Sequence, residues 1–166
     1  MNNVFWQILR AVLLLFVQIV VLNNIQLFGM VSPFLYTLII ITLPIKMPRN
    51  YVMLLGCLIG CVMDVFTNSY GFHFAATVLV AYARPFLMKL FATRENMEKL
   101  YPSYTNFGNA FYYYAFAMVF LHHFCLFAIE AFSFYYIGLV LLKTLCSSVF
   151  TLILIWGIET LKIRRK

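Results

Sequence analysis

Six residues that can ionise or exchange protons lie within stretches of the sequence that are otherwise almost entirely apolar. They are two acids, three histidines and a lysine: Asp64, Glu130, His73, His122, His123 and Lys143. Histidines and carboxylates are the common general acids, general bases and zinc ligands of enzymes. A lysine among apolar residues loses its charge or finds an acidic partner, and the obvious partner here is Asp64 or Glu130. Such a group could hold helices together, bind a ligand or perform chemistry.

The spacing of these residues predicts that they lie in one half of the molecule, which the orientation argued below makes the outer half. His123 and Glu130 are seven residues apart, which is two turns along one helix face. The helical rise places the two neighbouring histidines about 10–12 Å from Glu130, and Lys143 about 13 Å from the start of its own helix. Three interpretations follow. We favour a structural network of ion pairs and hydrogen bonds over a pocket for a lipid or polar ligand, and both over a metal or catalytic centre.

The sequence carries no motif of the kind that specifies a metal or catalytic centre. It contains neither the zinc motif H-E-x-x-H nor the nucleophile turn G-x-S-x-G. We therefore predict no catalytic residue, no cofactor and no metal site, and we expect that the protein is not an enzyme. An intramembrane hydrolase or transferase that uses His122, His123 and Glu130 is the least favoured alternative.

A stripe of small residues follows one face of the third apolar segment. Gly56, Gly60 and Asp64 succeed one another at intervals of four residues. Small residues at this spacing let a neighbouring backbone approach closely, which drives the packing of helices in lipid. The glycines are therefore predicted to form a packing face, either against another helix of the same chain or against a partner protein.

The elements that must position these residues are predicted to be membrane-spanning helices. Of the 166 residues, 64% are hydrophobic and 10% are charged, which leaves too little polar surface for a soluble domain. Four cysteines are too few for a secreted disulfide scaffold. A helix needs about 20 apolar residues to cross the hydrocarbon core of a bilayer. The sequence predicts six such spans, over residues 4–22, 31–45, 51–66, 72–91, 110–129 and 134–158. The expected fold is all-α, a single six-helix transmembrane domain over residues 1–166.

The basic residues determine the predicted orientation. All of the 12 lysines and arginines except Lys143 lie at or near one side of the six spans, and the three connections on the other side contain none. Because basic residues are retained in the cytoplasm, both termini are predicted to be cytoplasmic. The basic residues lie at the edges of apolar runs rather than in one patch, so we expect no nucleic-acid partner. No small-residue cleavage site follows the first span, which is expected to remain as a helix and not to be removed as a signal peptide.

Several short motifs resemble those of the rod shape-determining protein family MreD. They are Ser32-Pro33-Phe34-Leu35-Tyr36, Leu43-Pro44, Pro48-Arg49, Gly56-x3-Gly60-x3-Asp64, Tyr70-Gly71-Phe72-His73 and Tyr82. These motifs cover about residues 32–85. Beyond them, the likeness rests on the number of spans, the His122-His123 pair with Glu130, and the short basic tail.

The resemblance implies a fold similar to that of the substrate-binding subunits of energy-coupling-factor transporters. It implies a non-enzymatic scaffold in the bacterial inner membrane, which takes part in cell elongation and regulates cell shape. The implied partners are the periplasmic protein MreC, the peptidoglycan synthases RodA and penicillin-binding protein 2 and, indirectly, MreB filaments. A homodimer is a further option, and membrane lipids are expected to contact the basic side. The alternative function is a membrane small-molecule-binding or transporter subunit with a pocket in the outer half of the bundle.

Overall fold

The computed structural model describes residues 4–25, 31–132, 135 and 137–164, and the elements that it forms there are helices. The long ones are α1 (Val4–Val20), α3 (Arg49–Thr67), α4 (Phe72–Phe91), α7 (Ala110–Ala131) and α8 (Ile137–Arg164). The short ones are η1 (Leu22–Asn24), α2 (Thr37–Ile41), α5 (Arg94–Glu98) and α6 (Tyr104–Phe107). Residue 134, where the last span is predicted to start, and the basic residues 165 and 166 of the predicted tail lie outside the described residues.

The five long helices of the described chain are long and apolar enough to cross a membrane. Their outward faces carry exposed leucine, valine and phenylalanine side chains, which is the surface expected of a protein that faces lipid. Neighbouring helices pack in series, α3 on α4, α4 on α7 and α7 on α8. The prediction of an all-α fold is confirmed, and the chain has the helices of a multi-pass membrane protein.

The second of the six predicted spans is not a long helix. Residues 31–45 contain only the five-residue helix α2, and the remainder of this range consists of turns and irregular backbone. Pro33 and Pro44 frame α2, and each lacks the backbone N–H that a continuous helix requires. The prediction of a sixth spanning helix is therefore wrong, and the described chain has five helices of spanning length.

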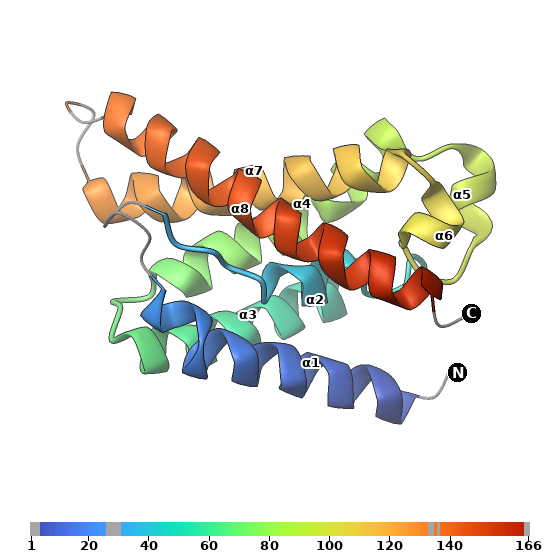
Figure 1. Ribbon diagram of the computed structural model, residues 1–166, viewed down its shortest axis with the longest axis horizontal. Helices are drawn as coiled ribbons and strands as arrows, with labels where there is room; N and C mark the ends of the chain where they lie inside the picture. Colours follow the sequence, from blue (N-terminus) through green and yellow to red (C-terminus); the bar gives the residue numbers. More distant parts are fainter. Residues whose placement is uncertain (1–3, 26–30, 133–134, 136, 165–166) are drawn as a thin grey trace.

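The irregular segment still has to travel the length of the bundle. Figure 1 shows that α1 and α3 run in the same direction, away from the end that holds the N-terminus, so the chain between them must return. It returns as the blue-to-cyan trace that carries α2, and we call residues 31–48 the return segment. Both termini lie at one end of the molecule (Figure 1), as an even number of passes requires.

The return segment lies in the core of the bundle. All residues from 33 to 41 are buried, and the side chains of Tyr36, Leu38, Ile40 and Ile41 have no exposed surface. Helix α2 contacts α3, α4 and α7. Turns within the segment pair some of its backbone groups, and in lipid the remaining N–H and C=O groups must find partners elsewhere in the protein.

Gln18 of α1 supplies several of these partners near the start of the return segment. Its Oε1 accepts hydrogen bonds from the N–H groups of Leu35, at 2.7 Å, and Tyr36, at 3.3 Å. Its Nε2 donates to the carbonyl oxygen of Pro33 at 3.0 Å. Gln18 is completely buried, so one side chain replaces the pairing that a helix would have provided.

Helix α8 pairs two further N–H groups of the return segment. The Ser147 hydroxyl accepts from the N–H of Ser32 at 3.1 Å, and the Thr151 hydroxyl accepts from the N–H of Phe34 at 3.2 Å. Both hydroxyl groups belong to one polar stripe, since the two residues are four apart on a helix. The polar face of α8 is therefore matched to the irregular backbone that lies against it.

The end of the return segment is paired by α4 and α7. The Arg84 guanidinium donates to the carbonyl oxygens of Leu43, at 2.5 Å, and Pro44, at 3.3 Å. The Tyr114 hydroxyl donates to the carbonyl oxygen of Ile41 at 3.3 Å. Side chains from four helices thus hold the backbone of a single segment.

Replacing Gln18 with leucine is expected to destabilise the protein by about 2–4 kcal/mol, because it leaves the buried N–H groups of Leu35 and Tyr36 without an acceptor. The free energy of unfolding is measured in mixed micelles with increasing SDS. The control is Asn24→Leu, which removes an exposed side-chain amide from η1, the short helix that follows α1. This substitution is expected to change the free energy of unfolding by less than about 0.5 kcal/mol. Equal stability of the two variants would contradict the role given to Gln18.

Candidate functional site

Asp64 of α3 caps the N-terminus of α4. Its Oδ1 accepts a hydrogen bond from the N–H of His73 at 3.0 Å, and its Oδ2 accepts from the N–H of Phe74 at 2.9 Å. The Ser69 hydroxyl donates to Oδ1 at 2.5 Å. The residue at the N-cap position of α4 is Gly71, which has no side chain with which to do this. The carboxylate also compensates the positive end of the helix dipole.

The two glycines of the stripe lie against the same helix. A Cβ atom placed on Gly60 would lie 2.5 Å from the Cα atom of Phe74 and 2.9 Å from its nitrogen, so no side chain fits there. A Cβ atom on Gly56 would lie 3.2 Å from the Cβ atom of Ala81, which is tight but less severe. Of the two alternatives for this packing face, the structure shows contact with another helix of the same chain. We call the contact of α3 with α4 the glycine seam.

Tyr36 of the return segment joins two of the three histidines. Its hydroxyl oxygen lies 2.8 Å from Nδ1 of His73 and 2.7 Å from Nε2 of His122. A phenol has one proton, so it donates to one imidazole and accepts from the other. All three side chains are buried. Because the main-chain N–H of His73 is bound to Asp64, the carboxylate, the imidazoles and the phenol form one connected structure.

His123 lies beside this structure and makes separate hydrogen bonds. Its Nδ1 is 2.8 Å from the carbonyl oxygen of Val119, which can only accept, so Nδ1 carries the proton. Its Nε2 is 3.3 Å from the Thr151 hydroxyl. His123 therefore connects α7 to the stripe of α8 that holds the return segment.

The Phe34 ring fills the space between the three histidines. Its centroid lies 5.0 Å from that of His73, 5.9 Å from that of His122 and 5.1 Å from that of His123. Two of these contacts are edge-to-face, which is a favourable geometry for aromatic rings. Within the described residues, no group of three or more histidine, cysteine or acidic side chains is placed to hold a metal ion. The histidines here are packed core residues.

Glu130 and Lys143 lie away from the histidines. Both line a pocket of about 290 Å³ between α7 and α8, whose other walls include Phe127 and Val140. Glu130 is exposed and Lys143 is half-buried. The ion pairs of the described residues are Glu95 with Lys99 and Glu159 with Lys162, so the predicted pairing of Lys143 with Asp64 or Glu130 is not formed.

The six predicted polar residues therefore do not form a single cluster. Asp64 belongs to the glycine seam, His73 and His122 are bridged by Tyr36, and His123 is bound to α8. The favoured interpretation, a network that holds helices together, describes these four residues and does not describe Glu130 or Lys143. A hydrolase that uses Glu130 with the histidines is not supported by this arrangement.

The comparison with known proteins yields no relative. No family model matches the chain, nor does any curated protein or solved structure. Function is therefore inferred from the geometry of the site and from the motifs that resemble MreD.

Several residues of this network were not predicted as site residues, above all Tyr36, Phe34, Gln18 and Thr151. A signal for Gln18 was present, because it is a polar side chain within an otherwise apolar span. The proline after Ser32 was also visible and marks the point where the return segment is irregular. The pairing between these residues could not be predicted, because they are up to 117 positions apart in the chain.

Replacing Gly60 with alanine is expected to destabilise the protein by about 3 kcal/mol, because the new Cβ atom forces the α4 backbone away. Gly56→Ala is expected to cost about 1 kcal/mol, because the new Cβ atom would lie 3.2 Å from the Ala81 Cβ atom and 3.3 Å from the Thr77 carbonyl oxygen, which have to shift less than the α4 backbone at Gly60. The matched control is Gly157→Ala on α8, where a Cβ atom meets nothing within 4 Å. That substitution is expected to be neutral or to stabilise by up to about 1 kcal/mol, from helix propensity alone. The free energy of unfolding of the three variants is measured in SDS. Values that did not follow this order would contradict the close contact of α3 with α4 at the glycine seam.

Replacing Asp64 with asparagine keeps the size of the cap but removes its charge and one acceptor. The expected loss is about 1–2 kcal/mol, from the lost hydrogen bond and the uncompensated helix dipole. Hydrogen exchange at the amides of His73 and Phe74 should accelerate more than exchange in the middle of α4. Glu130→Gln makes the same chemical change at an exposed position and should leave both measurements unaltered. A uniform acceleration along α4 would show that Asp64 does not act as a local cap.

Proposed function

We propose that the protein is a non-enzymatic scaffold of the bacterial inner membrane that takes part in cell elongation, as the resemblance to MreD implies. The observation that carries the proposal is where the motif residues lie. Residues 32–36 form the start of the return segment, Gly56, Gly60 and Asp64 form the glycine seam, and His73 connects the two through Tyr36. Motifs that are separate in the sequence thus make one continuous structure.

The buried polar groups of these motifs, on Tyr36, Asp64 and His73, are directed at the protein itself. Asp64 binds backbone N–H groups, Tyr36 binds two histidines, and the return segment is held by side chains of four helices. Such pairing fixes the relative positions of the helices. A bundle whose shape is fixed in this way is suited to present its outer surfaces to partner proteins, which is what a scaffold requires.

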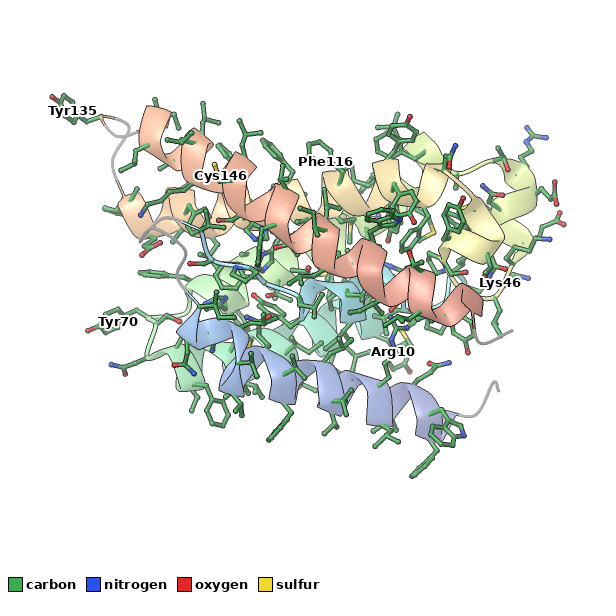
Figure 2. The ribbon with its side chains drawn as sticks, in the orientation of Figure 1. Arg10, Lys46, Tyr70, Phe116, Tyr135 and Cys146 are labelled. Carbon is green, nitrogen blue, oxygen red and sulfur yellow. The ribbon has the colours of Figure 1, made fainter. Side chains whose placement is uncertain are left out.

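The end of the molecule opposite the termini offers a surface for a periplasmic partner. Tyr70, in the connection between α3 and α4, is 94% exposed, and Phe132, which follows α7, is 93% exposed. Figure 2 shows Tyr70 pointing away from the bundle at this end. Aromatic side chains are frequent anchors of protein interfaces. With the termini in the cytoplasm, this end would face the periplasm and an MreC-like protein.

Affinity purification of the tagged protein from its own bacterium is expected to recover an MreC-like protein, together with RodA or penicillin-binding protein 2. Tyr70→Ala should reduce that recovery by at least about tenfold, as expected for an aromatic anchor. Tyr51→Ala is the matched control, since Tyr51 is 62% exposed and lies near the opposite end of α3. Depletion of the protein should convert elongated cells into round ones. Normal elongation after depletion, or failure to recover any of these partners, would refute the scaffold.

A second candidate is a membrane small-molecule-binding or transporter subunit, which the pocket between α7 and α8 favours. The pocket presents one acid and one base, Glu130 and Lys143, to a cavity of about 290 Å³. Mass spectrometry of the purified protein distinguishes the two candidates. A defined small molecule that is retained by the wild type and lost from Lys143→Gln would favour this second function.

A further inference from the structure

A second cavity, of about 410 Å³, separates α1 from the return segment and α3. It does not touch the histidines or the glycine seam. Its walls are largely aliphatic, with Ala11, Leu14 and Leu15 on α1 and Ile39, Leu55 and Ile59 opposite them. The polar residues among its walls are Gln7, Arg10 and Thr42.

The cavity exists because α1 is attached to the bundle by hydrogen bonds near its two ends. Gln18 holds the last turns to the return segment, and Gln7 donates to the Tyr101 hydroxyl near the first turn. Between these attachments, α1 is the least buried of the five spanning helices. Part of its inward face therefore lines an open volume, while Leu14 is buried in the core.

Arg10 is the charged residue among the walls of this cavity. Its Nη2 is buried and has no hydrogen-bond partner among the described residues. A buried guanidinium N–H without an acceptor is costly, and the positive charge of Arg10 lies beside the cavity that this residue lines. Figure 2 shows Arg10 between α1 and the C-terminal part of α8, toward the end that holds the termini.

The charges near Arg10 favour an anionic occupant. The guanidinium lies within electrostatic range of Glu159 and Lys162, which are bound to each other. Two cations thus share one carboxylate, and one positive charge remains uncompensated. Arginine is well suited to phosphate, since its planar N–H groups can bind two phosphate oxygens together.

We propose that this cavity binds an anionic phospholipid from the membrane leaflet on the side of the termini, with one acyl chain between α1 and α3 and the phosphate at Arg10. The volume lies within the range of about 300–1,000 Å³ typical of ligand pockets, which are also mainly apolar with a few polar groups. Basic pockets between membrane helices commonly hold anionic head groups. This site is separate from the surfaces of the proposed scaffold, and its test does not depend on that function.

The test measures lipid binding to the purified full-length protein by native mass spectrometry. The probes are phosphatidylglycerol, which carries a net negative charge, and phosphatidylcholine with the same acyl chains, which carries none. The wild type is expected to bind one phosphatidylglycerol at least tenfold more tightly than phosphatidylcholine. Arg10→Gln should abolish this preference. Lys46→Gln, which makes the same change of charge at an exposed position in the connection before α3, should retain it.

A second pair of variants tests the cavity without altering its charge. Ala11→Phe fills the volume and is expected to weaken phosphatidylglycerol binding at least tenfold, whereas Leu13→Phe adds an aromatic ring to the exposed side of α1 and should not. Thermal unfolding checks that each variant is folded. Equal affinity for the two lipids would overturn the proposal, as would unchanged binding by Ala11→Phe. An equal loss in Lys46→Gln would show a general attraction to surface charge and would also overturn it.

Discussion

The structure depends on one constraint, which is that irregular backbone buried at membrane depth must find all its hydrogen-bond partners within the protein. The return segment pairs only part of its backbone through its own turns and α2, because its prolines interrupt the helix on either side of α2. Side chains of three different helices supply the missing partners, namely Gln18, Ser147, Thr151 and Arg84. Each unpaired backbone group would cost several kcal/mol in lipid. Several buried polar side chains of this apolar chain are thus explained by one segment that is not helical.

The glycine seam follows from a similar requirement at the turn between α3 and α4. The helices are joined by a tight connection in which Asn68 and Gly71 adopt left-handed backbone conformations, with φ values of 53° and 89°. Such a turn brings the helices close together and leaves the first N–H groups of α4 without partners. Asp64 binds these groups, and Gly60 allows the close approach that places the carboxylate there. The stripe of small residues and the acid that ends it therefore serve one turn.

The five long helices could be predicted from hydropathy because a spanning helix is a local property of about 20 consecutive residues. The return segment could not be predicted in this way, since its residues are as apolar as those of a helix and hydropathy does not report backbone geometry. Pro33 and Pro44 were the local signal that the helix is interrupted. The acid at the glycine seam was identified, but its partner was not, because pairing with a helix N-terminus requires the turn geometry. For the same reason, Lys143 was assigned a partner by charge alone, and the fold places it elsewhere.

The loose packing of α1 is a further consequence of the return segment. An irregular segment with a five-residue helix does not offer the regular ridges and grooves into which a neighbouring helix could pack along its length. Helix α1 is therefore held where Gln18 reaches the backbone of this segment and where Gln7 binds the Tyr101 hydroxyl, and the cavity lies between these two attachments. In water such a gap would be closed by collapse of apolar surface, but lipid provides no hydrophobic driving force between helices. A membrane protein that holds irregular backbone in its core is thus disposed to contain a cavity of this kind, and an acyl chain is the natural material to fill it.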